Sequence, residues 1–371
     1  MKKTRALCVV VSLLLSSAAL AQEPVYLGVS IPLSGQFASY GNDIQEALEL
    51  GRDEINQTGG IDGLPLELIY EDSEGDPQIS KRIARRFTED ARIVAEIGDF
   101  SSTCSMAAQP LYHRAGMVQF SPTSSHAGFA PGSPYSFSVS GTSQGQSSAI
   151  ARLAVERLNK KKLAVLYQNT DWGIAEQQAF VEEAKRLGAE IVAIEPYLKE
   201  LTDFTPVLAT LQAAQPEVLY LCSLYEDGAL ISKQRHQLGW HDVIVIGAGP
   251  LHSQELLDIA GEAVEGLLTT TSFFPKDPRP QVQDFVQRYE ARYHRTPNLF
   301  AAQAYDVINI ITNALKQVGT DRQKLRDAIA HTRDYPGAIG KITFSEYGDI
   351  QKEYLLLQVK NGEFVIYNDE D

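Results

Sequence analysis

Three successive hydroxyl side chains begin one segment of this chain that could bind a ligand. Ser101, Ser102 and Thr103 follow the apolar run "IVAEIG" and open a helical pattern in "GDFSSTCSMAAQP". Ser and Thr directly before a helix are common N-caps, so the row also has a purely structural explanation. Backbone N–H groups at a helix start, together with hydroxyls, form an uncharged anion site that suits a carboxylate. The segment therefore predicts a capped helix, an anion site, or both.

A second hydroxyl-rich segment, "SPTSS" at 121–125, follows the next apolar run. This segment can be a simple turn. In open parallel sheets, however, ligands bind outside the carboxyl ends of the strands, where the loops lead into helices. Two such loops at one sheet edge can converge, which would bring their hydroxyl groups to one point. A further loop of this kind, "PLSGQFASYG", places Tyr40 just before a helix.

Other chemistries find little support. "VIVIGAGP" lacks the full dinucleotide-binding glycine pattern because position 252 is His. No nucleophile elbow of the G-x-S-x-G kind is present, so a Ser-His-Asp hydrolase is disfavoured. Asp171 and Glu226 can be imagined as a glycosidase pair, but acids after strands are common on solvated loops. The seven histidines show no metal-ligand spacing. We therefore predict no catalytic residues, no metal and no cofactor.

The elements that must position these residues follow an alternating pattern. Apolar, strand-like runs precede helical patterns, and the first such helix carries Ile44, Ala47, Leu48 and Ile55 on one face. The runs are at 25–31, 66–72, 92–98, 117–120, 162–168, 189–197, 217–223 and 243–249. This pattern predicts an α/β fold of parallel sheets covered by helices. The length indicates two domains, with candidate boundaries at 129–146 and 266–280, a long helix over 298–318 and a terminal β region.

The N-terminus predicts export. Residues 1–21 combine a cationic start, a short apolar core and an Ala-x-Ala end, as in a secretory signal peptide, so we expect a mature chain that is soluble outside the cytoplasm. The apolar core is too short to span a membrane. The net charge of −14 disfavours binding to nucleic acid or to an anionic lipid surface. Cys104 and Cys222 lie in separate halves, and we expect free thiols.

Three stretches together resemble a known family. "LGVSIPLSGQFASYG", "ALELGRDEINQTGGIDGLPLELIYEDSEGDP" and "IGDFSSTCSMAAQPLYHRAGMVQFSPTSSHA" are similar to the type I periplasmic binding proteins of the leucine/isoleucine/valine-binding class. Those proteins are the substrate-capturing subunits of ABC importers. The resemblance implies two doubly wound parallel-sheet lobes joined by a three-crossing hinge, with lobe I over 24–140 and 272–350 and lobe II over 141–271 and 351–371. It also implies a periplasmic monomer that binds a small molecule and presents it to a permease and its ATPase.

The resemblance also implies the site. Positions that hold the ligand's carboxylate fall in the two hydroxyl-rich loops, at Ser102, Thr123 and Ser125, with Ser101 beside them. The aromatic wall falls on Tyr40, Phe100, Trp172, Phe300 and, with a one-residue gap, Tyr225.

One departure leaves the ligand open. Amino-acid binders of this class place a carboxylate against the ligand's ammonium, and the matching position here is Gly249. Either Glu226, Asp227 or Asp171 supplies that charge, or the ligand is an aromatic or aliphatic carboxylate or an amide without an α-ammonium, since a buried unpaired ammonium is costly. The family default is a branched-chain or related amino acid. A sensor subunit for a membrane receptor and an exported hydrolase are the rival functions.

Overall fold

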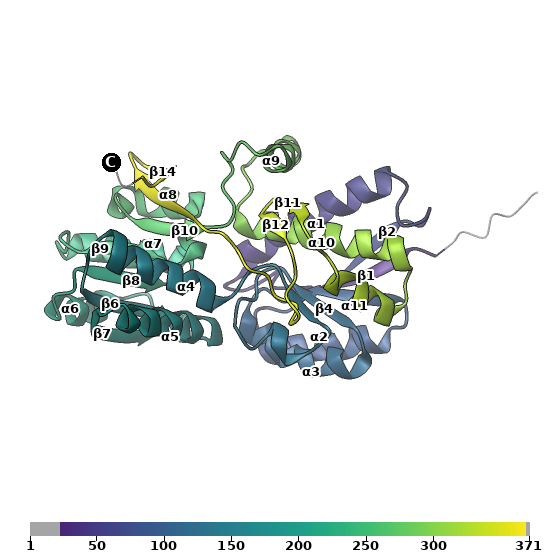
Figure 1. The fold of residues 1–371 in the computed structure, drawn as a ribbon, viewed down its shortest axis with the longest axis horizontal. Coiled ribbons are helices and arrows are strands. Elements are labelled where there is room, and N and C mark those ends of the chain that lie inside the picture. Colours follow the sequence, from purple (N-terminus) through teal and green to yellow (C-terminus); the bar gives the residue numbers. More distant parts are fainter. Residues whose placement is uncertain (1–22, 369–371) are drawn as a thin grey trace, which may run out of the picture.

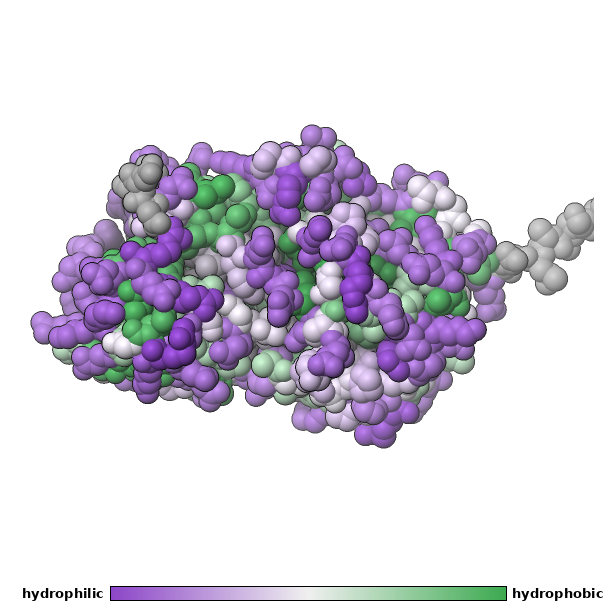
Figure 2. Space-filling model, viewed as in Figure 1, coloured by the Kyte–Doolittle hydropathy of each residue, from purple (hydrophilic) through white to green (hydrophobic). Residues whose placement is uncertain are grey.

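The computed structural model describes residues 23–368 as two lobes (Figure 1), and the predicted signal peptide lies outside these residues. Each lobe is built on its own sheet, one of five strands and one of seven. The fold is α/β with parallel sheets, as the alternating pattern predicted. The face drawn in Figure 2 is mostly hydrophilic, as a net charge of −14 leads one to expect. Within the described part of the chain, no helix combines the length and the apolar character needed to cross a membrane.

The first sheet is parallel throughout, with strand order β2-β1-β3-β4-β5. Its strands are β1 (Val25–Ile31), β2 (Leu66–Asp72), β3 (Ile93–Gly98), β4 (Val118–Ser121) and β5 (Ser136–Ser138). Helices α2 (Pro77–Glu89) and α3 (Ser102–Ala115) cover one face, and α1 (Ala38–Gln57) and α10 (Leu299–Val318) belong to the core on the other face. Helices α9 (Pro280–Tyr293) and α11 (Arg322–Ala330), with the small hairpin β11 (Tyr335–Gly337) and β12 (Gly340–Ile342), complete this lobe.

The second sheet has strand order β14-β13-β10-β9-β8-β6-β7. Its parallel strands are β6 (Lys162–Gln168), β7 (Glu190–Tyr197), β8 (Val218–Cys222), β9 (Ile244–Gly247) and β10 (Leu268–Thr271). Strands β13 (Leu355–Lys360) and β14 (Glu363–Ile366) join antiparallel at one edge. Asn361 and Gly362 connect them with φ of 56° and 75°, which is the geometry of a tight hairpin turn.

Helices cover both faces of the second sheet as well. Helices α4 (Ser143–Arg152) and α5 (Asp171–Arg186) share one buried cluster with Val165 and Tyr220. Helices α6 (Thr205–Ala213), α7 (Tyr225–Gln237) and α8 (Gln254–Ala260) bury their apolar side chains with the opposite face. A strand covered on both sides must be apolar on both sides, which explains the continuous apolar runs in the sequence.

Three segments cross between the lobes, after β5, after β10 and before β13 (Figure 1). They lie side by side: Lys352 Nζ donates to Ser272 Oγ at 2.9 Å, and a Cβ on Gly141 would lie 2.9 Å from the hydroxyl of Tyr354. The strands of the first sheet fall within residues 24–140, and those of the second within 141–271 and 351–371. The exact lobe boundaries stay a prediction.

Candidate functional site

A cavity of about 460 Å³ lies between the loops that follow the strands of the two lobes. The first lobe contributes the loop before α1, the start of α2, the start of α3, the segment after β4 and the start of α10. The second contributes the segments after β6, β7, β8 and β9. The residues that line it include Phe37, Phe100, Ser101, Ser102, Thr103, Thr123, Gln168, Thr170, Asp171, Trp172, Lys199, Leu224 and Phe300.

The start of α3 presents backbone N–H groups at the cavity. Ser101 is the N-cap, and its side chain accepts from the N–H of Cys104 at 3.2 Å. The first N–H groups of a helix have no partner within the helix, and the first turn of α3 carries no acidic residue that would compete for them. Since Ser101, Ser102 and Thr103 all line the cavity, these donors lie at its wall. A carboxylate fits this end better than a cation does.

The hydroxyl of Ser102 keeps its proton available. Ser102 is 2% exposed, and its Oγ accepts from the N–H of His126 at 3.4 Å. Because Oγ accepts here, its own O–H can donate to a ligand.

Thr123 is arranged in the opposite way. Its Oγ1–H donates to the carbonyl of Phe100 at 2.6 Å. That bond commits the proton, so Oγ1 can only accept from a ligand. Thr123 and Ser102 therefore line the same cavity with complementary hydrogen-bonding roles.

Asp99, which the sequence reasoning missed, anchors this loop from behind. Its carboxylate accepts from Ser80 Oγ at 2.9 Å, from Ser30 Oγ at 3.3 Å and from the N–H of Phe100 at 2.6 Å. Burial raises the pKa of Asp99 to about 6. These partners come from three different segments, so no local sequence pattern announces the network. Asp99 fixes the chain that leads from β3 into the hydroxyl row.

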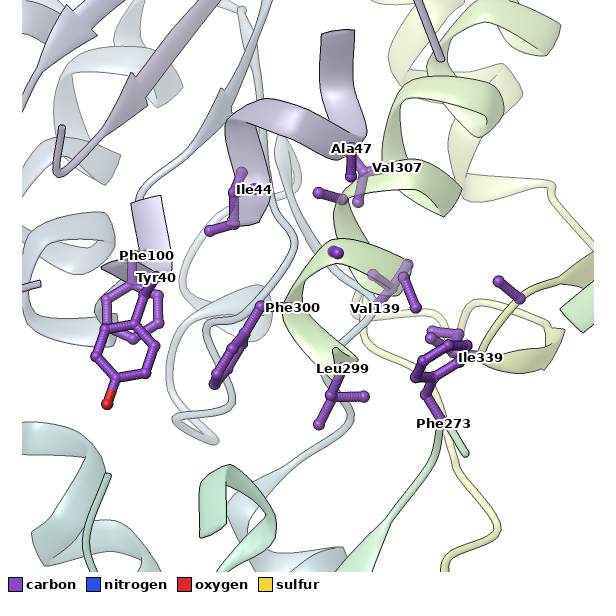
Figure 3. Packing of buried hydrophobic residues seen from close by; sticks show 14 of the residues in the cluster. Tyr40, Ile44, Ala47, Phe100, Val139, Phe273, Leu299, Phe300, Val307 and Ile339 are labelled. Carbon is purple, nitrogen blue, oxygen red and sulfur yellow. The ribbon is translucent and has the colours of Figure 1, made fainter. Parts of the chain in front are cut away.

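Aromatic rings form the apolar wall. Phe100 and Phe300, both predicted, line the cavity together with Phe37, which was not predicted. Tyr40 stacks on Phe100 with centroids 4.8 Å apart, and Figure 3 shows the two rings lying over each other. The ring of Tyr40 also packs against that of Tyr225 of the other lobe, with centroids 4.8 Å apart. Tyr40 and Tyr225 are buried behind this wall and are not among the lining residues.

Trp172 reaches the cavity from the first turn of α5. Thr170 caps this helix by accepting from the N–H of Gly173 at 3.2 Å. The indole Nε1–H donates to the buried carboxylate of Glu176 at 3.1 Å, which holds the ring in place. Asp171, one of the predicted ammonium partners, also lines the cavity but is exposed.

The other two predicted ammonium partners have partners of their own. Glu226 accepts from Ser39 Oγ of the first lobe at 3.1 Å. Asp227 accepts from Gln168 Nε2 and from the hydroxyl of Tyr197, each at 3.0 Å. Burial raises the pKa of both carboxyl groups. Neither Glu226 nor Asp227 is among the lining residues.

Two further predicted residues lie outside the lining. Ser125 Oγ lies 3.3 Å from Ser143 Oγ, and the N–H of Ser143 donates to the carbonyl of Ser125 at 2.8 Å. Ser125 thus contacts the start of α4, beside the first crossing. A Cβ on Gly249 would lie 2.4 Å from Nε2 of Gln146, so an amide fills the space that a larger residue at position 249 would need.

The lobes touch across the mouth of the cavity. Gln36 Nε2 donates to the carbonyl of Lys199 at 2.6 Å. The Lys199 ammonium lies 5.6 Å from the centre of the Phe37 ring. The loop after β7 therefore closes over the loop before α1.

The two cysteines of the described chain lie away from the surface. Cys104 and Cys222 are both free and buried, which confirms the prediction of free thiols. Burial raises the pKa of the Cys104 thiol to about 12. Over residues 23–368, no cluster of three His, Cys, Asp or Glu side chains could hold a metal ion.

Comparison with known proteins gives a consistent result. The model of the family described as periplasmic binding protein matches residues 24–363. The Leu/Ile/Val-binding protein homolog 1 of Brucella suis biovar 1 (strain 1330) is 27% identical over 358 residues, which cover 94% of this chain and 94% of that protein.

Two solved structures of similar fold hold different ligands. The branched-chain amino acid transporter substrate binding protein LivJ from Streptococcus pneumoniae, in complex with isoleucine, is 25% identical and covers 92% of this chain and 98% of its own, with a TM-score of 0.86. The solute binding protein of an ABC transporter from Rhodopseudomonas palustris BisB5, in complex with 3,4-dihydroxy benzoic acid, is 25% identical. The match covers 92% of this chain and 95% of that chain, with a TM-score of 0.85.

Proposed function

Because this chain belongs to the periplasmic binding protein family, we propose that its inter-lobe cavity captures a small organic acid with an apolar or aromatic body. The chain is a substrate-binding protein of an ABC transporter. The observation that carries the ligand class is the start of α3: free N–H donors and Ser102 lie at one wall of a cavity whose other walls include Phe37, Phe100, Phe300 and Trp172. A carboxylate pairs with the donors, and the rings cover its apolar body.

The ligands of the two similar structures agree with this class. Isoleucine and 3,4-dihydroxy benzoic acid share a carboxylate and an apolar body, although one is an aliphatic amino acid and the other an aromatic acid. The first is the family default for this chain, and the second represents the alternative without an α-ammonium. Asp171 is the one predicted ammonium partner at the cavity, and its side chain is exposed.

The mechanism we propose is hinge closure. A ligand that contacts both lobes favours the closed arrangement by the difference between its contact energies with the closed and open forms. Lobe I holds the carboxylate, and Trp172 of lobe II covers the body. The closed monomer is then recognised by the permease of the importer in the periplasm. We expect binding without chemical turnover.

Matched ligand pairs test this function. Protein freed of co-purified ligand by unfolding and refolding is titrated calorimetrically with isoleucine and isoleucinamide, and with 3,4-dihydroxybenzoate and 3,4-dihydroxybenzamide. We expect a carboxylate from at least one pair to bind, and its amide to bind at least tenfold more weakly, which corresponds to roughly 1.4 kcal/mol. Binding of an amide as tight as that of its acid would reject the carboxylate site. Incubation followed by mass spectrometry checks that the ligand is returned unchanged.

A further inference from the structure

Gln168 is a buried residue at the cavity wall whose side-chain amide nitrogen already has a hydrogen-bond partner. It is the last residue of β6, is 2% exposed and lines the cavity. Its Nε2 donates to Asp227 Oδ2 at 3.0 Å. No hydrogen bond to its Oε1 is found within residues 23–368. The amide therefore has an uncommitted acceptor at a site that a ligand is expected to fill.

Asp227 decides which end of this amide is free. A carboxylate only accepts, so it binds Nε2 and turns Oε1 away. The hydroxyl of Tyr197 donates to the same Oδ2 at 3.0 Å, which fixes the carboxylate from a second side. Asp227 lies in the first turn of α7 and is 9% exposed. Three segments of lobe II thus cooperate to hold Gln168 in a single orientation.

We propose that Gln168 is a specificity-determining residue whose Oε1 accepts a hydrogen bond from a donor group on the ligand, and that Asp227 is its positioning residue. This inference rests on the proposed function. It narrows the ligand class to a carboxylate that also carries an N–H or O–H donor. Thr123 supports the same class, because its hydroxyl proton is committed to Phe100 and its Oγ1 is left as a second acceptor.

The energetic reason is the cost of leaving a buried acceptor unpaired. A ligand without a donor would cover Oε1 and remove its water without replacing the hydrogen bond. Sites built to bind a donor reject the analogue that lacks it more strongly than an apolar pocket rejects a changed methylene. Both an ammonium and a hydroxyl satisfy Oε1, so the shared chemistry is the donor.

Three acids with one carbon skeleton separate these cases. Leucine carries an ammonium, 2-hydroxy-4-methylpentanoate carries a hydroxyl, and 4-methylpentanoate carries neither. 3,4-Dihydroxybenzoate and 3,4-dimethoxybenzoate form the aromatic counterpart. At least one of the two series should bind to the unmodified protein. Within that series, we expect a donor-bearing acid to bind at least tenfold more tightly than its donor-free analogue. The better of leucine and the hydroxy acid identifies the donor.

Two variants test the roles of the residues. Asp227→Asn lets the Gln168 amide rotate by about 180°, and Gln168→Met removes the acceptor. We expect each variant to lower the affinity for the donor-bearing acid roughly tenfold and to change the affinity for the donor-free acid by no more than about twofold. Gln178→Met changes an exposed glutamine of α5 and is the control. A merely structural effect would weaken both acids equally.

The outcomes separate two failures. If the donor-free acid binds the unmodified protein as tightly as its partner, the role of Gln168 is rejected and the carboxylate site stands. An equal loss of affinity for both acids in Asp227→Asn likewise rejects the positioning role of Asp227. Thermal melting shows whether this variant is folded. If no carboxylate of either series binds, the proposed function fails and this inference fails with it.

Discussion

The indole of Trp172 and the carboxylate of Glu176 lie one helical turn apart on α5 and are joined by a hydrogen bond of 3.1 Å. Glu176 is fully buried and also accepts from Ser147 of α4, and it lies 3.4 Å from the hydroxyl of Tyr220. The ring at the cavity wall is therefore oriented by a polar group in the interior of lobe II. Burial raises the pKa of Glu176 to about 7.

Glu176→Gln should change how stability depends on pH. The folded state raises the pKa of this carboxyl from 4.5 to about 7, so between these values the folded protein binds more protons than the unfolded chain. The stabilisation associated with this proton is fully present below pH 4.5 and is lost as pH rises through 7. Gln cannot titrate, so the variant should lose this decline, on the order of 3 kcal/mol. Chemical denaturation from pH 5 to pH 8 measures it.

The matched control is Glu182→Gln, which alters an exposed glutamate of the same helix. That variant should keep the decline of the unmodified protein. Parallel pH profiles for the protein and Glu176→Gln would contradict the assignment of the shift to Glu176.

Trp172→Ala should weaken ligand binding, because it removes an aromatic wall of the cavity. Phe keeps the ring but lacks the Nε1–H that bonds to Glu176, so Trp172→Phe should have the smaller effect on affinity. Loss of a large buried aromatic contact costs roughly 2 kcal/mol or more, which is about thirtyfold in Kd. Calorimetry on both variants measures it. Unchanged affinity in Trp172→Ala would remove Trp172 from the site.

Ser102→Ala should weaken carboxylate binding by roughly 1.5 to 3 kcal/mol, the range for a hydrogen bond to a charged group. Ser101→Ala is the informative comparison. Ser101 caps α3, so its loss should lower the free energy of unfolding by about 1 kcal/mol. Titration and thermal melting of both variants distinguish the roles. A loss of stability in Ser102→Ala without any loss of affinity would contradict the role given to its hydroxyl.

The central strands β3, β6 and β8 were predictable because nearly all of their residues are buried, which gives continuous apolar runs. Strands β5 and β10 were not predicted as strands, because they lie in segments that were taken as candidate domain boundaries. Residues 162–168 were predicted as a strand, and β6 spans Lys162–Gln168. The long helix predicted over 298–318 is α10, capped by Asn298. The hairpin β13–β14 was placed only as a terminal β region, although "KNGEF" contains the Asn-Gly turn signal that could have resolved it.

The loops that line the cavity were predictable, and the contacts behind them were less so. Ser102, Thr123, Trp172 and Phe300 line one cavity, because the loops after parallel strands meet at one sheet edge. The partner of a buried polar side chain depends instead on segments that are distant in sequence. Asp99 and Glu226 illustrate this: Asp99 accepts from residues 19 and 69 positions away, and Glu226 accepts from a residue 187 positions away in the other lobe.

The hydrogen bond between Gln36 and Lys199 should affect the rate of ligand release. Gln36 Nε2 donates to the Lys199 carbonyl between the lobes, and Gln36 is not among the residues that line the cavity. Gln36→Ala removes a bond that exists only when the lobes meet, so it should speed ligand release and leave the association rate nearly unchanged. One hydrogen bond contributes roughly 0.5 to 1.5 kcal/mol, which is about two- to tenfold in the dissociation rate.

Stopped-flow measurement with a ligand identified by calorimetry checks this prediction. The control is Ser34→Ala in the same loop, since the Ser34 hydroxyl donates to Asp72 within lobe I. Ser34→Ala should release ligand at the rate of the unmodified protein. If Gln36→Ala slows association instead, the hydrogen bond forms before the lobes close, because only an interaction present during the encounter can affect the association rate. Gln36 would then act on the open form of the cleft and not on the closed form.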